Sequence, residues 1–244
     1  MPLPRYREMF YAGRLPKGVK WLIIVNTGMY VVQYLGGAAL QSNLQMLYLV
    51  PELVVHKFPF FIWQLFTYMF LHGGIWHLLF NMLALWMFGT PIEQDWGTRR
   101  FLKFYFLCGI AAGVCDVTLH AILGDWGTST IGASGAIYGL LVAFGVLYPE
   151  APVLMFLLFP MKAKYMVMIF AGIEFLTTLG PNNGVSSIAH LGGMAFGYLY
   201  LKRRLPSVPM PDWGGAYRQW RMARAKKKFQ VYMRNRGGRG PWVN

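Results

Sequence analysis

Apolar residues run almost without interruption through several stretches of the chain, and short segments rich in glycine, proline and charge separate them. Runs of about 20 apolar residues are long enough to cross a hydrocarbon core about 30 Å thick, and only helices or closed barrels satisfy their backbone hydrogen bonds there. Because the runs are continuous, the pattern predicts helices. We expect six spans, at Lys20–Leu40, Leu65–Gly89, Phe101–Leu123, Ile131–Leu147, Tyr165–Leu179 and Ser187–Leu201.

The composition agrees with a membrane protein. Of the 244 residues, 56% are hydrophobic and only 13% are charged, which is abnormal for a soluble domain of this size. The predicted fold class is therefore an all-α integral membrane bundle of six helices. One further apolar stretch, Ala151–Pro160, is bracketed by prolines and too short to span, so we expect it at the membrane surface or leading into the fifth helix.

Positive charge is unevenly distributed among the segments between the predicted helices. Lysine and arginine in short loops are retained on the cytoplasmic side. These residues precede helix one and lie between helices two and three and between helices four and five, whereas the other three loops together hold only Lys57. With the basic tail, this places both termini in the cytoplasm and requires an even number of spans. We divide the chain into a basic N-terminal segment (1–19), a six-helix membrane domain (20–204) and a basic C-terminal tail (205–244).

Other classes are less well supported. The first apolar stretch has a basic start and small residues, as a cleaved signal peptide has, but its length and the even number of spans argue against cleavage. Cys108 and Cys115 share one face of predicted helix three and are interpreted as small apolar packing residues, not as a disulfide or metal pair. No nucleotide-binding loop or zinc-ligand spacing occurs, so we predict neither a cofactor nor a metal.

Three chemically capable side chains fall at one depth in the predicted bundle. With the N-terminus inside, helices two, four and six all enter the membrane from the external side. His77 lies early in helix two, Ser134 at the start of helix four and His190 near the start of helix six. All three should sit a few residues below the outer surface, which indicates a shared site.

Small residues provide a way to bring two of these helices together. Glycines four residues apart allow close helix approach in lipid, and two such pairs begin beside the candidate residues: Gly135 and Gly139, and Gly193 and Gly197. If these faces meet, Ser134 and His190 come within hydrogen-bond distance, and the imidazole can take the hydroxyl proton as the oxygen attacks a carbonyl. Taken separately, each motif has a structural alternative, because Gly-x-Ser-Gly arises by chance and a membrane histidine can simply bond a neighbour.

Acyl transfer also needs hydrogen-bond donors aimed at the developing oxyanion. His77 and Asn81 are four residues apart on one helix face, and the main-chain N–H of Ser134 near a helix N-terminus is a third donor. Alone, Asn81 is better explained as a bond between helices and His77 as an interfacial residue. The soluble α/β-hydrolase elbow is rejected because Ala136 replaces the last glycine of Gly-x-Ser-x-Gly and no strand precedes it.

These residues together resemble the rhomboid intramembrane serine proteases, over about Trp63 to Gly197. The matching motifs are His72, His77 and Asn81 in the spacing His-x4-His-x3-Asn, Gly132-Ala133-Ser134-Gly135, and Ala189-His190 followed by Gly193 and Gly197. The resemblance implies that Ser134 is the nucleophile and His190 the general base, without an aspartate. It implies an oxyanion hole made by His77, Asn81 and the Ser134 amide, and it matches Tyr138 to an aromatic residue that stacks on the catalytic histidine.

The chain also departs from the family pattern, and inactive relatives exist. Family members commonly carry Trp-Arg in the first external loop, where this chain has Trp63-Gln64. Glu93 and Gly97 match family positions, but Asp95 falls where many bacterial members have a basic residue. These positions bear on stability or gating more than on chemistry.

Two carboxylates lie within predicted spans, Asp116 on helix three and Glu174 on helix five. Such groups are costly in lipid and should face the protein interior or water. Proton movement in a transporter is one interpretation, but no pore-lining series of polar residues accompanies them, so hydrogen bonds to neighbouring helices are favoured. His120 is placed to pair with Asp116 at i, i+4.

The basic tail carries interleaved aromatic residues: Trp213, Tyr217, Trp220, Phe229 and Tyr232. Its position beside the membrane favours an anionic lipid surface, at about 1 kcal/mol per basic side chain. A solvated tail with one short helix around 217–229 explains the pattern equally well, and no nucleic-acid partner is expected.

The sequence therefore predicts an intramembrane serine endopeptidase whose active site opens to the extracytoplasmic side. Its substrate is expected to be a transmembrane segment presented as extended chain, so helix-weakening residues near the outer surface should favour cleavage. The fifth helix and Phe80 are candidates for a lateral gate. The alternative is a rhomboid-like protein that binds membrane helices without cutting them. From the resemblance, we expect a bacterial inner membrane, with an organellar membrane as the alternative.

Overall fold

The computed structural model describes residues 15–57, 61–155, 159–180, 185–204, 221–226 and 229–230. The chain divides into two units, Met1–Leu205 and Pro206–Asn244. In the second unit the described residues are helical and exposed, at positions where a short tail helix was predicted. The tail aromatics Trp213, Tyr217, Trp220 and Tyr232 lie outside the described residues. All six predicted membrane spans fall within the first unit.

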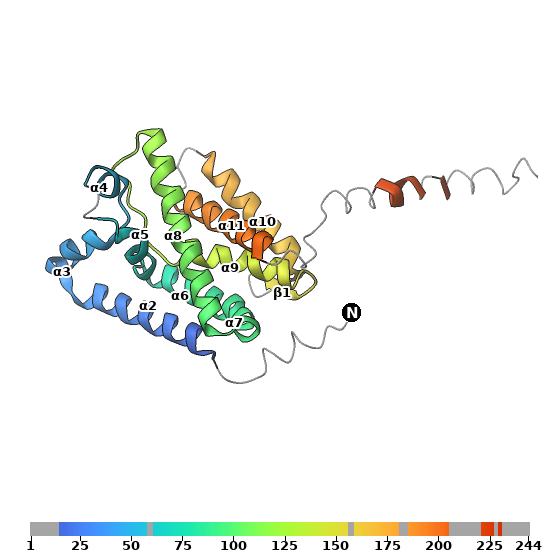
Figure 1. The fold of residues 1–244 in the computed structure, drawn as a ribbon, viewed down its shortest axis with the longest axis horizontal. Helices are drawn as coiled ribbons and strands as arrows, with labels where there is room; N and C mark the ends of the chain where they lie inside the picture. Colours follow the sequence, from blue (N-terminus) through green and yellow to red (C-terminus); the bar gives the residue numbers. More distant parts are fainter. Residues whose placement is uncertain are drawn as a thin grey trace, which may run out of the picture. The chain divides into compact units, whose positions relative to one another are not determined.

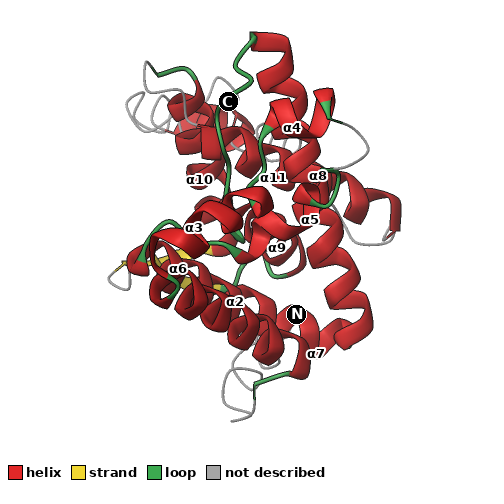
Figure 2. Ribbon diagram, turned by 90° about the vertical axis from the view of Figure 1, so that its left-hand side faces the viewer, coloured by secondary structure: helices red, strands yellow, loops and turns green. Residues whose placement is uncertain are grey.

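The described residues of the first unit are helical apart from one short strand pair and the loops (Figures 1 and 2). Its elements are, in order, α2 (Lys17–Leu35), α3 (Gly37–Leu44), the 3-10 turn η1 (Gln45–Leu47), α4 (Pro51–His56), α5 (Gln64–Thr67), the 3-10 turn η2 (Tyr68–Phe70), α6 (Ile75–Ala84), the π turn η3 (Leu85–Gly89), α7 (Thr90–Trp96), α8 (Thr98–Leu123), α9 (Ser134–Leu147), β1 (Pro152–Met155), β2 (Phe159–Lys162), α10 (Ala163–Thr178) and α11 (Val185–Arg204).

Helices α8, α9 and α11 pack on one another, with α2 on one side of α8 and α10 beside α11 (Figure 1). Helix α9 is the most enclosed of them, since every residue from Gly135 to Val146 except Tyr138 is buried. Helix α9 contacts α8, α10, α11 and η3, so protein and not lipid covers most of its apolar surface. Ser134, at the start of α9, is half-buried.

The outer surface of the first unit is apolar, as a lipid environment requires. Large hydrophobic side chains are more than 60% exposed on several helices, among them Trp21, Leu35, Trp76, Ile122 and Leu176. Two stretches, Ile75–Trp96 and Thr98–Leu123, are long and apolar enough to cross a membrane. The membrane class agrees with these findings. The total of six spans and the cytoplasmic termini stay predictions.

The predicted first helix, Lys20–Leu40, is wrong at its C-terminal end. Helix α2 stops at Leu35, and Gly37 adopts a left-handed φ of 59° before the chain begins α3. Glycine takes this conformation without the steric cost that a side chain adds. The two adjacent glycines therefore turn a stretch that is apolar by composition into two helices.

The predicted second helix, Leu65–Gly89, is wrong at its N-terminal end. Residues 64–70 form α5 and η2, residues 71–74 are irregular, and the long helix begins only at Ile75. It then continues to Trp96 through the π turn η3. Pro91 lacks an N–H and cannot complete a regular helical bond one turn back, which accounts for a local change of helix type.

The remaining predicted spans correspond to α8, α9, α10 and α11, and no boundary differs from the prediction by more than three residues. The stretch at 151–160 was predicted to lie at the surface or to lead into helix five. Its described residues contribute β1 and the start of β2, an antiparallel pair that leads directly into α10. Glu150 binds Lys162 and Lys164 beside this pair. Their hydrogen bonds lower the pKa of Glu150 to about 2, with Lys162 as the larger cause.

Glu93 shows how a charged residue is accommodated in the interior. It is only 3% exposed, and its carboxylate accepts the main-chain N–H groups of Gly18 and Val19, each at 2.7 Å, and the hydroxyl of Thr98 at 2.6 Å. The first amides of a helix have no partners within the helix, and a carboxylate there also complements the helix dipole. Glu93 of α7 therefore caps α2.

Candidate active site

Ser134 and His190 form a direct hydrogen-bonded pair. The Oγ atom of Ser134, the first residue of α9, lies 2.7 Å from Nε2 of His190 on α11. Both residues are half-buried. This is the arrangement in which a neutral imidazole takes the proton of a hydroxyl nucleophile.

Glycines on α9 and α11 make this contact possible. A Cβ atom on Gly193 would lie 2.0 Å from the carbonyl oxygen of Gly135, and one on Gly197 would lie 3.1 Å from the backbone of Gly139. The two glycine ridges thus face one another with no side chain between them. One turn before Gly193, the close approach brings His190 to Ser134.

Tyr138 holds the plane of the imidazole. Its ring stacks on that of His190 with centroids 4.2 Å apart and planes inclined by 15°. The Tyr138 hydroxyl donates a hydrogen bond to the carboxylate of Glu174 on α10. The stacked ring is therefore fixed at both ends, by α9 backbone and by α10.

His77 lies close to the backbone just before Ser134. Gly132 adopts a φ of 127°, and a Cβ there would lie 2.8 Å from Nε2 of His77. On its other side, Nδ1 of His77 accepts the N–H of Gly73 at 3.4 Å. In a neutral imidazole the second nitrogen then carries the proton, so His77 presents an Nε2–H donor toward the Gly132–Ser134 turn.

Asn81 lies one helical turn after His77 on α6 and is 7% exposed. Its Nδ2 has no hydrogen-bond partner in the part of the chain that the structure describes. Buried amide donors are normally paired, and an unpaired one needs an explanation. The free amides at the start of α9 add further donors at this point, because the first N–H groups of a helix have no partner within it.

His72, the first histidine of the predicted motif, is nearly buried in the irregular segment before α6. Its ring packs edge-on against that of His77, with centroids 5.1 Å apart. Its main-chain N–H donates to Oε1 of Gln33 on α2 at 3.0 Å. His72 therefore supports His77 and does not contact Ser134 or His190 in any interaction recorded among the described residues.

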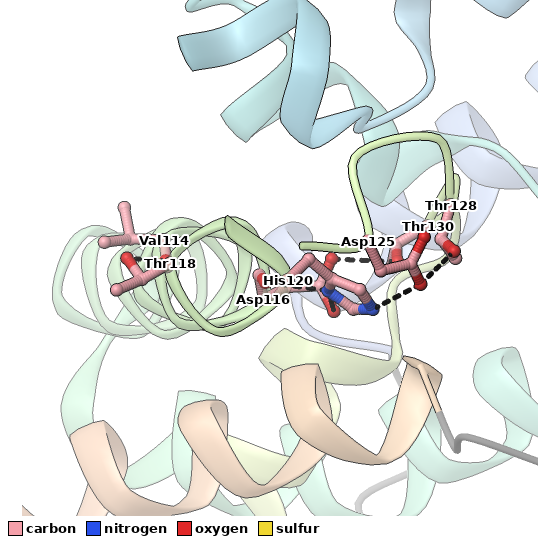
Figure 3. A network of polar contacts seen from close by, with 7 residues as sticks. All are labelled: Val114, Asp116, Thr118, His120, Asp125, Thr128 and Thr130. Carbon is pink, nitrogen blue, oxygen red and sulfur yellow. Dashed lines mark hydrogen bonds and ion pairs between the residues drawn. The ribbon is translucent and has the colours of Figure 1, made fainter. Parts of the chain in front are cut away.

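The loop from α8 to α9 is tied down at several points before it reaches Ser134. Thr130 pairs with Leu49 through two backbone hydrogen bonds of 2.9 and 3.1 Å, and the N–H of Gly132 donates to the carbonyl of Tyr68 at 2.9 Å. The Thr130 hydroxyl donates to Asp116 at 2.9 Å. Figure 3 shows this contact beside His120, whose ring lies 3.7 Å from Asp116 and 3.8 Å from Asp125. Asp116 of α8 thus helps to fix the loop that leads to Ser134.

Gln64, the departure from the family pattern, is fully buried. Its Oε1 accepts the N–H of Val50 at 3.1 Å, and its Nε2 donates to the carbonyl of Met46 at 3.1 Å. Trp63 donates to the same carbonyl at 3.2 Å. The first loop is therefore held by neutral hydrogen bonds that use both ends of an amide, which an arginine cannot reproduce because it only donates.

Glu174 is the residue whose position the sequence did not reveal. Its Oε1 lies 3.1 Å from Nδ1 of His190, and the side chains are only 11% and 14% exposed. The sequence indicated a carboxylate facing another helix, but nothing in an apolar helix showed which neighbour it faces.

Cys108 and Cys115 are both free. Each packs from α8 against a glycine, Cys108 against Gly139 of α9 and Cys115 against Gly192 of α11. No cluster of metal-ligating side chains occurs among residues that the structure describes.

Comparison with known proteins identifies the family. Residues 59–206, more than half of the chain, match the family described as "Rhomboid domain". The chain belongs to the rhomboid family. The matched range contains α6, α9, α10 and α11, the helices that carry His77, Ser134, Glu174 and His190.

Curated rhomboid relatives come from different kinds of organism. The chain is 34% identical over 144 residues to "Rhomboid protein 1, mitochondrial" of Saccharomyces cerevisiae, covering 54% of this chain and 38% of that protein. It is 34% identical over 148 residues to "RHOMBOID-like protein 1" of Arabidopsis thaliana, covering 61% and 35%. It is 32% identical over 136 residues to "Rhomboid protease GluP" of Bacillus subtilis, covering 56% and 25%. The similarity thus spans less than two-fifths of the length of each of these relatives.

Proposed function

We propose that this rhomboid-family chain is an intramembrane serine endopeptidase. The observation that carries the proposal is the 2.7 Å hydrogen bond between Ser134 and His190, beside the buried Asn81 amide, whose Nδ2 has no partner among the described residues. A family relationship alone is insufficient, because fold does not determine activity and relatives include proteins named only as rhomboid-like. The proposal therefore rests on the chemistry of these side chains.

The proposed first step is acylation. Nε2 of His190 takes the proton of Ser134 while Oγ forms a bond to the carbonyl carbon of the substrate and the carbonyl electron pair moves to oxygen. The resulting imidazolium then gives this proton to the leaving amine as the C–N bond breaks. In the second step His190 takes a proton from water, the hydroxide attacks the acyl-enzyme, and Ser134 regains its proton as it leaves.

The oxyanion of each tetrahedral intermediate is proposed to lie between His77, Asn81 and the amide of Ser134. Each offers an N–H, and the unpaired state of the Asn81 amide is what a site awaiting a charged oxygen requires. Gly132 supports this role because any side chain there would displace His77. No metal or cofactor takes part in the proposed reaction.

The depth of the site follows from the length of α9. Its 14 residues span about 21 Å at about 1.5 Å per residue, less than the roughly 30 Å of hydrocarbon. If its C-terminal end lies at one surface, Ser134 lies below the other. The charge distribution predicts that this other surface is the extracytoplasmic one. From the family resemblance, we expect the membrane to be a bacterial inner membrane.

A cavity offers a route for the substrate. It has a volume of about 580 Å³ and a mainly apolar lining that includes Asn81, Tyr138, Phe80, Leu154 and Phe170. It borders the site at Asn81 and Tyr138, although neither Ser134 nor His190 is among its described lining residues, and it extends between α6, η3, α9, β1 and α10. We propose that a transmembrane segment of another protein enters here, with Phe80, which is 64% exposed, at its edge. Only an unwound segment presents a free peptide carbonyl, so substrates with helix-weakening residues are favoured.

The test is cleavage by purified protein in liposomes. Wild-type protein should cut a model transmembrane substrate, and Ser134→Ala and His190→Ala should each abolish cutting while still binding it. If wild type and both variants bind the substrate equally and none cuts it, the chain is a membrane-helix binding protein and the proposal is wrong. Ion flux abolished by neutralising Asp116 but not by Ser134→Ala would instead indicate a transporter.

A further inference from the structure

The imidazole of His190 lies between a hydroxyl and a carboxylate. Nε2 is 2.7 Å from Ser134, and Nδ1 is 3.1 Å from Oε1 of Glu174. The three residues come from three helices, α9, α11 and α10, and the side chains of His190 and Glu174 are only 14% and 11% exposed. The arrangement has the order nucleophile, base and acid, although the family resemblance implies only the first two.

Glu174 is held against His190 by its other neighbours. A carboxylate inside a membrane bundle is costly unless it is paired and hydrogen-bonded. Its Oε1 accepts the Tyr138 hydroxyl, the same oxygen lies against the imidazole, and Ser187 on α11 is a further hydrogen-bonding neighbour. In the described ranges no other carboxylate lies within 4 Å of the His190 ring.

Nδ1 of His190 has no hydrogen-bond acceptor other than Glu174 among the described residues. It is buried and makes no hydrogen bond in the described part of the chain, and Oε1 of Glu174 lies 3.1 Å away. Catalytic hydrogen bonds are often loose in the free enzyme and tighten around substrate.

We propose that Glu174 is a positioning residue that acts through His190. An ionised carboxylate only accepts hydrogen bonds, so it selects the tautomer with a proton on Nδ1 and leaves the lone pair of Nε2 toward Ser134. It also stabilises the imidazolium formed during acylation, without itself taking the proton. This role rests on the proposed protease function.

Other titratable groups near His190 do not supply this contact. His77 on α6 and Asp116 on α8 influence His190 electrostatically, but neither is paired with Nδ1. Tyr138 on α9 contacts the ring face and not the nitrogen. Glu174 is the group that determines where the imidazole carries its proton.

Kinetics on liposome-embedded protein provide the first test. Glu174→Gln keeps the size of the side chain and removes its charge, and it should lower kcat by about tenfold to a thousandfold with KM changed less than threefold. Glu174→Asp should recover part of this loss. Tyr138→Phe is the comparison variant: it keeps the stacked ring and removes one hydrogen bond that holds Glu174, so its loss in kcat should be smaller than that of Glu174→Gln.

Two kinetic results would overturn the proposal. One is a folded Glu174→Gln variant with kcat within twofold of wild type. The other is an equal loss in Glu174→Gln and Tyr138→Phe, which would mean that the carboxylate merely holds the aromatic ring.

A second measurement is independent of activity. Imidazole nitrogen NMR of protein labelled with nitrogen-15 histidine, with His190 assigned by difference against His190→Ala, reports which ring nitrogen carries the proton. We expect a proton on Nδ1 in wild type, and observing it on Nε2 alone would refute the proposal even if Glu174→Gln fails to fold. If wild type shows the expected tautomer yet does not cleave, the protease proposal fails and the Glu174 contact stands.

Discussion

The backbone of Gly193 on α11 lies so close to Gly135 on α9 that a Cβ atom on Gly193 would be 2.0 Å from the Gly135 carbonyl oxygen. Backbone, unlike a flexible side chain, cannot move aside at small cost. The distance between the two helices is thus set at the point where His190 meets Ser134. A substitution at Gly193 should therefore reduce both the stability of the protein and its activity.

The first prediction concerns Gly193→Ala. The added methyl group must push α11 away from α9, at a cost of about 1–3 kcal/mol for overpacking. It should also lower the cleavage rate on the order of a hundredfold, because a shift of about 1 Å in catalytic geometry has that effect. Thermal unfolding in detergent and liposome cleavage measure the two effects.

Gly28→Ala on α2 is the control for this substitution. Nothing lies within 4 Å of a Cβ atom there, so the change should leave both the unfolding temperature and the activity near those of wild type. A Gly193→Ala variant that behaves like Gly28→Ala would show that the contact between α9 and α11 is not needed.

The second prediction concerns Asn81→Ala. Its unpaired Nδ2 is proposed to donate to the oxyanion, which exists only during the reaction. Removing one such donor costs about a hundredfold to a thousandfold in kcat, with KM little changed. Steady-state kinetics decide the matter, since a raised KM at constant kcat would place Asn81 in substrate binding instead.

The third prediction concerns the bond between Thr130 and Asp116. Thr130→Val keeps the shape of the side chain but leaves a buried carboxylate oxygen unpaired, which should reduce the free energy of unfolding by about 1–3 kcal/mol. Thr118→Val is the matched control on α8, because its hydroxyl bonds only an exposed carbonyl, and its effect should stay within about 0.5 kcal/mol. Equal stability of the two variants would remove the structural role assigned to Asp116.

The fourth prediction concerns Gln64→Arg, which introduces the common family residue. Arginine cannot accept the N–H of Val50, so the variant should be less stable than wild type by about 1–3 kcal/mol. Gln94→Arg, at an exposed position of α7, controls for the added charge. A Gln64→Arg protein that is more stable or more active than wild type would contradict this account of the first loop.

Several features could be predicted from the sequence, and the reason is physical. Glycine spacing and equal depth along three helices indicated that Ser134, His190 and His77 belong together, because both depend only on position along a helix. The contact between the glycines of α9 and those of α11 could be predicted for the same reason, because the spacing of four residues places each pair on one helix face.

Other features could not be predicted from an apolar pattern. Helix boundaries at Leu35 and Ile75 depend on Gly37 and on the irregular segment after η2, which hydropathy does not reveal. The partner of Glu174 depends on the rotation of α10 about its axis. In lipid both faces of such a helix are apolar, so the alternation that marks the inner face in soluble proteins is weak.

The central claim is that His190 activates Ser134 as a nucleophile in the folded protein. A fluorophosphonate probe reacts with activated serines, and mass spectrometry locates the adduct. We predict one covalent adduct on Ser134 in wild type and none in His190→Ala or in denatured protein. Folded wild-type protein that leaves Ser134 unmodified, or a His190→Ala variant labelled as fast as wild type, would contradict the account.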